Sequence, residues 1–280
     1  MYKNSFTRKN PGLFVFLVDQ SGSMEDIMPS NGFSLAVNAS EAVNTIIQES
    51  ILRLTDTEED GTEFVKQSLT VIIIGYGGKG TGYGNEWDYK AEVLCGETIT
   101  EINSKYATKD SQIAHEEMRD VLQPVFGGGT PMASAFLTAK EAIESWVQAH
   151  NDEKDPVPVL INITDGRLND IDNIDELKKA VNDIKSLAIP DGNPLVLNIH
   201  ITKDAVEPVK YPKDESSCPD KYSKLLFEIS SEVSKDLIDN NAEFAKNSFV
   251  GGERLFMSNV SDFNALIQFV RLGTPQKKLQ

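Results

Sequence analysis

Three short polar stretches of this chain carry oxygen-bearing side chains beside glycine: Asp19-Gln20-Ser21-Gly22-Ser23, Gly127-Gly128-Gly129-Thr130-Pro131 and Thr164-Asp165-Gly166. They supply two carboxylates and three uncharged hydroxyls, from Asp19, Asp165, Ser21, Ser23 and Thr130. Hard oxygen donors of this kind suit Mg²⁺, Mn²⁺ or Ca²⁺ and do not suit zinc or copper. The alternation Asp-x-Ser-x-Ser lets every second side chain of a loop point to one place. We therefore expect a divalent-metal site.

The elements that must position these stretches follow from the apolar pattern. Runs rich in Val, Ile and Leu predict buried strands, and apolar residues at helical spacing predict the helices between them. The strands are expected at Leu13–Val18, Leu69–Gly75, Val157–Thr164, Pro194–Ile201 and Leu255–Met257. The helices are expected at Leu35–Leu54, Met132–Trp146, Ile174–Leu187, Tyr222–Leu237 and Phe263–Val270, with Ser261 as the N-cap of the last.

This alternation predicts an α/β fold, a doubly wound, Rossmann-like and mostly parallel sheet with helices on both faces. Tyr89–Cys95 follows Leu69–Gly75 through a glycine-rich link too short for a helix, so we expect it to form one antiparallel edge strand. Ligands of such sheets lie beyond the carboxyl ends of the strands, where the strand order reverses. If the strands beginning at Leu13 and Val157 are neighbours there, the three polar stretches meet in one crevice.

No linker or internal repeat divides the 280 residues. We expect an N-terminal extension over residues 1–12, one domain over residues 13–272 and a polar C-terminal tail over residues 273–280. Cys95 and Cys218 match no metal-ligand spacing and are typical of a reduced, intracellular protein.

The net charge of −16, from 27 basic and 43 acidic residues, argues against nucleic acid as a partner because such a chain repels phosphate. No apolar run has the length of a membrane span, and Leu13–Val18 is too short for a signal peptide. These observations predict a cytoplasmic protein with no membrane partner.

In their order along the chain, "SGSM", "GGGTPM" and "ITDG" resemble the von Willebrand factor A (VWA) domain family. They are closest to stand-alone bacterial VWA proteins, including those of the tellurium-resistance type. The resemblance covers Leu13 to Leu272. It implies a complete metal-ion-dependent adhesion site that binds a Mg²⁺ ion, or alternatively Mn²⁺ or Ca²⁺, directly or through water. It also implies that a protein partner supplies an Asp or Glu carboxylate to that ion. The implied metal ligands are Asp19, Ser21, Ser23, Thr130 and Asp165.

The residue types favour binding over catalysis. Ser21 and Ser23 have no His or Lys base nearby in the sequence, so they lack the activation that a nucleophile needs. We predict a monomeric, non-enzymatic, metal-dependent protein-interaction module without catalytic residues. Its acidic charge opposes an acidic partner at long range, but salt screens this repulsion beyond about 10 Å at about 0.1 M. Glu25 and Asp26 either line the rim of the site or face solvent.

Two other functions stay open. The chain could be an accessory subunit of an ATPase or of a kinase-type or phosphatase-type complex. It could also be a metal-dependent phosphohydrolase, because Asp19 follows the first strand of a doubly wound sheet. The haloacid-dehalogenase pattern, however, has a second Asp where Ser21 stands.

Each polar stretch alone also has a purely structural interpretation. Thr130-Pro131 is typical of a plain helix start, with Thr as the N-cap and Pro as the first helical residue. Asp19 and Ser21 can form an Asx-type turn, and Asp165-Gly166 is a common turn pair. The metal site is indicated by the three stretches together and in this order.

Overall fold

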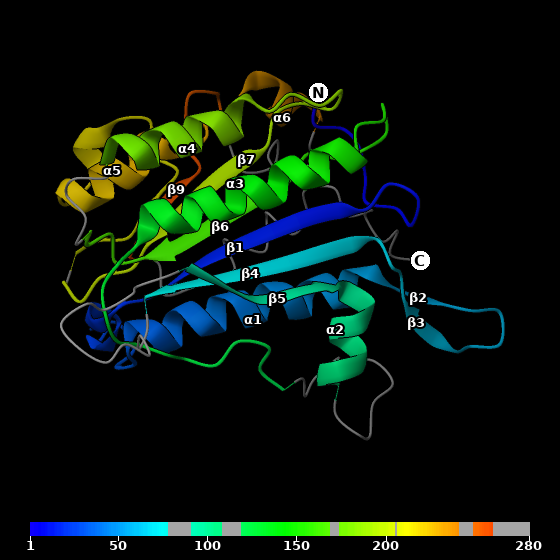
Figure 1. Ribbon diagram of the computed structural model, residues 1–280, viewed down its shortest axis with the longest axis horizontal. Coiled ribbons are helices and arrows are strands. Elements are labelled where there is room, and N and C mark those ends of the chain that lie inside the picture. Colours follow the sequence, from blue (N-terminus) through cyan, green and yellow to red (C-terminus); the bar gives the residue numbers. More distant parts are fainter. Residues whose placement is uncertain (78–90, 108–118, 169–173, 205, 241–248, 260–280) are drawn as a thin grey trace.

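The computed structural model describes residues 1–77, 91–107, 119–168, 174–204, 206–240 and 249–259. A seven-stranded sheet with the order β5-β4-β1-β6-β7-β9-β8 forms the centre of this part of the chain (Figure 1). Its strands are β1 (Gly12–Gln20), β4 (Leu69–Gly77), β5 (Ala91–Thr98), β6 (Val159–Thr164), β7 (Leu195–His200), β8 (Val209–Lys210) and β9 (Phe256–Ser258). A separate hairpin pairs β2 (Thr55–Thr57) with β3 (Glu63–Val65).

The described helices lie on both faces of the sheet, as predicted (Figure 1). They are α1 (Leu35–Leu54), α2 (Ile99–Tyr106), α3 (Met132–Ala149), α4 (Ile174–Ser186), α5 (Lys221–Ile229) and α6 (Lys235–Asn240), with short 3₁₀ turns η1 (Gly22–Glu25) and η3 (Glu215–Ser217). Among these described helices, none is both long and apolar enough to cross a membrane.

The predicted fold class is confirmed. Strands β4, β1, β6, β7 and β9 pair in parallel, and β5 pairs antiparallel with β4 at one edge. The other edge carries β8, a two-residue strand antiparallel to β9 that the sequence did not predict. It lies in the proline-containing segment after β7, where apolar periodicity gives no signal.

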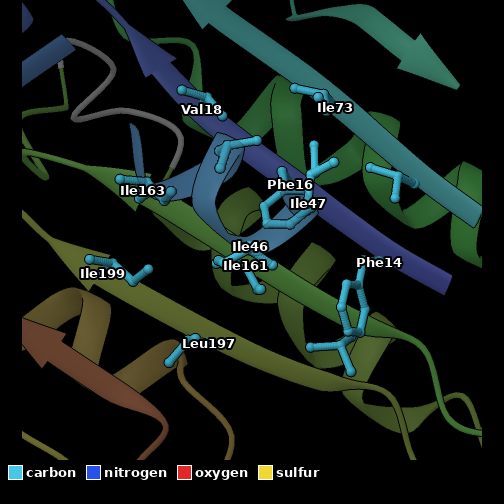
Figure 2. Close-up of a cluster of buried hydrophobic side chains, with 14 of the residues drawn as sticks. Phe14, Phe16, Val18, Ile46, Ile47, Ile73, Ile161, Ile163, Leu197 and Ile199 are labelled. Atoms are coloured by element: carbon cyan, nitrogen blue, oxygen red, sulfur yellow. The ribbon is translucent and has the colours of Figure 1, made fainter. Parts of the chain in front are cut away.

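Strand β1 is buried on both faces, which explains why its sequence shows no polar alternation. Phe14, Phe16 and Val18 belong to the hydrophobic cluster that contains apolar residues of α1, α2 and α6 (Figure 2). Leu13 and Leu17 belong to the opposite cluster, with residues of α3, α4 and α5. The strand that ends in the first polar stretch is therefore fixed from both sides.

The single helix predicted over Tyr222–Leu237 is wrong. Helix α5 ends at Ile229 and α6 begins at Lys235. The backbone N–H of Ser231 donates to the Val196 carbonyl, and the hydroxyl of Ser230 donates back to the Leu226 carbonyl. The chain leaves the helix here because the backbone of Ser231 bonds to the sheet, whereas the Ser230 N–H still bonds to the helix carbonyls of Leu226 and Phe227. The predicted helix Phe263–Val270 with its N-cap Ser261 lies outside the described residues.

Two smaller differences are local. Helix α2 was not predicted, although Thr98 and Glu101 form a capping box, a signal present in the sequence. The predicted acidic loop Thr55–Glu63 contributes to both strands of the β2–β3 hairpin. In the N-terminal segment, Phe6 is buried with its ring edge-on to that of Phe14. The proposed domain limits stay predictions.

Candidate metal centre

Strands β1 and β6 are neighbours at the point where the strand order reverses, which is the condition for the three polar stretches to meet. The chain continues from β1 outward to β4 on one side of β1, and returns to β6 on the other side. Val18 of β1 pairs with Ile163 of β6 in parallel register. Asp19 and Thr164, the next residue of each strand, therefore lie at the same level at the carboxyl edge of the sheet.

The glycine-rich loop before Thr130 is hydrogen-bonded to the loop that follows β1. The Gly22 N–H donates to the Gly128 carbonyl (3.1 Å), and the Gly127 N–H donates to the Gln20 carbonyl (2.9 Å). Gly77, at the end of β4, packs against both loops with a positive φ of 103°. A Cβ at this position would lie 2.6 Å from the Ser21 nitrogen and 2.8 Å from the Gly129 carbonyl oxygen. Only glycine fits such a close approach.

Asp19 is a fully buried carboxylate with both oxygens hydrogen-bonded. Its Oδ1 accepts from the Ser21 N–H (2.8 Å), and its Oδ2 accepts from the Thr164 hydroxyl (2.6 Å). Burial and, next in size, the charge of Asp165 raise the pKa of Asp19 to about 7, against the lowering effect of these hydrogen bonds. The protein therefore stabilises the ionised form of Asp19 less well than water does. Thr164 was not predicted as part of the site.

Asp165 presents one open oxygen. The residue is 3% exposed, and its Oδ1 accepts from the Arg167 N–H (3.1 Å). Its Oδ2 is buried without a hydrogen-bond partner and forms an ion pair with Arg167 Nε at 3.6 Å. A buried carboxylate oxygen that accepts no hydrogen bond is costly, and a cation bound to this atom would lower that cost.

Two of the predicted hydroxyl ligands, Ser21 and Ser23, lie in the loop that begins at Asp19. The Ser21 and Ser23 hydroxyl oxygens are 3.1 Å apart and share a hydrogen bond. Helix α3 begins at Met132 with Pro131 at its N-cap position and no side-chain cap, so the structural interpretation of Thr130 as N-cap is wrong. The Met132 N–H bonds to the Thr130 carbonyl instead of its hydroxyl. The buried Thr130 side chain is thus not used for capping.

The rim of the site carries charged residues that the sequence indicated only in part. Asp26 faces two cations: its Oδ2 lies 3.3 Å from Arg167 Nη1 and 2.9 Å from Lys203 Nζ. Asp26 is thus engaged in ion pairs, and its place at the rim of a metal site stays a prediction. Arg167 directly follows the third polar stretch, which is a weak signal. Lys203 comes from the loop after β7, and no sequence pattern connects it with this site.

The buried imidazole of His200 is hydrogen-bonded to the backbone of the Asp165 loop. His200 Nε2–H donates to the Asp165 carbonyl (3.1 Å), which fixes the tautomer, and Nδ1 accepts from the Ser258 hydroxyl (2.9 Å). Burial lowers the pKa of His200 and keeps the ring neutral. His200 thus contacts the backbone of the site and not the hydroxyls of Ser21 and Ser23.

The donor set fits a hard divalent cation. Among the described residues, no group of three or more His, Cys, Asp or Glu side chains is arranged to hold a metal ion. Asp19 and Asp165 supply carboxylate oxygens, and both the charge of Asp165 and the hydrogen bonds of Ser21 act on Asp19, so the three residues lie close together. Oxygen donors of this kind match Mg²⁺ rather than softer metals.

No protein-family model matches the chain, and no curated protein is similar to it in sequence. Among solved structures, similarity is found to protein BatB of Bacteroides thetaiotaomicron (16% identity, TM-score 0.36), covering 68% of this chain and 66% of that one. The manganese-loaded TRAP protein of Plasmodium vivax gives 15% identity and a TM-score of 0.34, with 69% and 58% covered. The pilus adhesin SpaC of Lactobacillus rhamnosus GG gives 15% identity and a TM-score of 0.48, with 97% and 32% covered.

Each of these matches spans less than two thirds of the other chain's length, and similarity at this level carries no conclusion about activity. The sheet order, with its antiparallel edge strand β5, agrees with the fold class expected from the sequence. A complete adhesion site and the tellurium-resistance type stay predictions.

Proposed function

We propose that this chain is a non-enzymatic protein-interaction module that binds Mg²⁺ through Asp19, Ser21, Ser23, Thr130 and Asp165 and recognises a carboxylate of a partner protein. One observation carries the proposal. Asp165 Oδ2 is a buried anionic oxygen without a hydrogen bond, next to a second buried acid whose pKa is raised to about 7. A cation in this crevice would relieve both costs.

The bonding of Asp19 supports an ion that keeps positive charge for a partner. In this proposal Asp19 acts through a water molecule, which is supported by the hydrogen bonds that its two oxygens already accept from Ser21 and Thr164. The hydroxyls of Ser21 and Ser23 carry no charge. Asp165 would then be the one carboxylate in direct contact, and it neutralises half of a divalent charge. The remaining charge favours an Asp or Glu carboxylate from outside the chain.

The same contacts disfavour a phosphohydrolase. An Asp nucleophile needs a free oxygen at the reacting centre, whereas those of Asp19 are bonded and fully buried. Ser21 and Ser23 bond to each other, and the imidazole of His200 is directed to the Asp165 carbonyl and to Ser258. A base that would activate either serine is absent from the described contacts.

Isothermal titration of the full chain with Mg²⁺ tests the proposal. We expect binding by the wild type and at least tenfold weaker binding by Asp165→Asn, which keeps the shape but removes the charge. The matched control is Asp155→Asn, a buried aspartate that accepts from Asn10 and Asp152 at a different place in the fold. Absence of binding by the wild type, or equal binding by Asp165→Asn, would contradict the proposal.

Affinity capture with and without EDTA, followed by mass spectrometry, tests the partner. We expect a protein that is retained only with Mg²⁺ and is lost with Asp165→Asn as bait. An ATPase retained equally in EDTA would instead favour the accessory-subunit function.

A further inference from the structure

We infer that Arg167 and Lys203 form a second anchor for the partner, so that the site selects an acidic segment with two carboxylates over a segment with one. This inference rests on the proposed function. One carboxylate would bind the metal ion beside Asp165, and the other would bind the two rim cations.

The first observation is that both cations converge on a single oxygen. Arg167 Nη1 lies 3.3 Å and Lys203 Nζ 2.9 Å from Asp26 Oδ2. Arg167 Nε also lies 3.6 Å from Asp165 Oδ2, so when a metal ion binds that oxygen the two positive charges share the carboxylate of Asp26. A second carboxylate would complete the pairing without breaking either contact.

The second observation is that these cations keep unused donors that reach solvent. An ammonium group has three N–H donors and a guanidinium has five, of which the described contacts use few. The side chains of Lys203 and Arg167 are 44% and 36% exposed, compared with 30% for Asp26. An incoming carboxylate can therefore reach them.

The third observation concerns the charges around the rim. Glu25 and Asp204 adjoin Asp26 and Lys203 in sequence, are exposed, and form no described ion pair with Arg167 or Lys203. The chain has a net charge of −16, so these two exposed cations are a local positive charge to which an acidic partner can bind.

The distance between the two anchors sets the spacing of the partner's acids. The guanidinium of Arg167 spans the gap, with Nε 3.6 Å from the open Asp165 Oδ2 and Nη1 3.3 Å from Asp26 Oδ2. An extended segment rises about 3.3–3.6 Å per residue, and its alternate side chains point to the same side. The fitting partner segment is therefore acidic–any–acidic.

The test uses Mn²⁺ in place of Mg²⁺ and water proton relaxation, which falls when a carboxylate displaces metal-bound water. Two synthetic peptides serve as probes: acetyl-Gly-Glu-Gly-Glu-Gly-amide, and the same peptide with one Glu replaced by Gln. We expect the two-acid peptide to bind the wild type at least fivefold more tightly, whereas a purely statistical advantage would be about twofold, the number of equivalent acids.

In the double variant Arg167→Gln/Lys203→Gln we expect this preference to fall to about twofold while Mn²⁺ still binds. The matched control is Lys66→Gln/Lys105→Gln, which makes the same change in net charge at the other end of the sheet and should keep the preference. Mn²⁺ binding without a preference in the wild type, or a preference unchanged in the double variant, would overturn this inference and leave the proposed function standing. Absence of Mn²⁺ binding would overturn both.

Discussion

Replacing Asp19 with Asn removes a buried acid whose ionised form destabilises the folded, metal-free protein. The pKa of Asp19 is raised from 3.8 to about 7, first by burial and then by Asp165. Between these pH values the folded chain keeps Asp19 protonated while the unfolded chain ionises it. The folded state binds more protons, so the free energy of unfolding falls as pH rises from about 4 to 7 and then levels off. The full difference corresponds to about 4 kcal/mol.

Asn does not titrate, so the fall in the free energy of unfolding with rising pH that Asp19 causes is absent from Asp19→Asn. In EDTA we expect the stability of the variant relative to the wild type to increase by about 3 kcal/mol between pH 5 and pH 8. Urea unfolding followed by circular dichroism at several pH values measures this difference directly. A pH-independent difference would refute the account of Asp19 as an uncompensated acid.

The same unfolding measurement with added Mg²⁺ tests whether the ion binds at Asp19. At a Mg²⁺ concentration 100-fold above the dissociation constant, the wild type should gain about 2.7 kcal/mol of stability at pH 8. Asp19→Asn should gain little, whereas Asp155→Asn should respond as the wild type does. An equal gain in Asp19→Asn would show that Mg²⁺ acts elsewhere.

Three further outcomes follow from the same contacts. In Gly77→Ala, a Cβ would lie 2.6 Å from the Ser21 nitrogen. We therefore expect this variant to lose about 2 kcal/mol of stability in urea unfolding and at least tenfold in Mg²⁺ affinity by calorimetry. Unchanged values would contradict the packing described. Thr164→Val removes a bond that lowers the pKa of Asp19, so the pH midpoint of Mg²⁺ binding should move upward in titrations from pH 5 to 9, and not downward. Phe16→Ala, in the α1-facing cluster, should lose about 3–5 kcal/mol in urea unfolding without a change in the pH dependence of Mg²⁺ binding.

Much of the fold could be predicted because its signals are local. Strand β1 is buried on both faces, and an unbroken run from Leu13 to Val18 is the direct result. The link before β5 is short and rich in glycine, which disfavours a crossover helix, so an antiparallel edge strand could be expected. The meeting of Asp19 with the Asp165 loop then follows from one topological rule about strand order.

The rest of the site depends on contacts that no local pattern encodes. Thr164 contributes a hydroxyl to Asp19 only because β1 and β6 are in register, and Lys203 reaches Asp26 from a loop after β7. Helix α5 ends early because Ser231 bonds to Val196 of β7, a tertiary contact that overrides helical periodicity. Thr130 followed by Pro131 has the sequence of an N-cap, yet close packing of the glycine loop on β1 and β4 shifts the start of α3.

Anomalous diffraction from crystals of the full chain grown with Mn²⁺ tests the central claim most directly. We expect one strong anomalous peak within about 2.0–2.6 Å of Asp165 Oδ2 and of the Ser21 and Ser23 hydroxyls. We also expect this peak to disappear in crystals of Asp165→Asn. A peak at another place on the chain, or an empty crevice at saturating Mn²⁺, would contradict that claim.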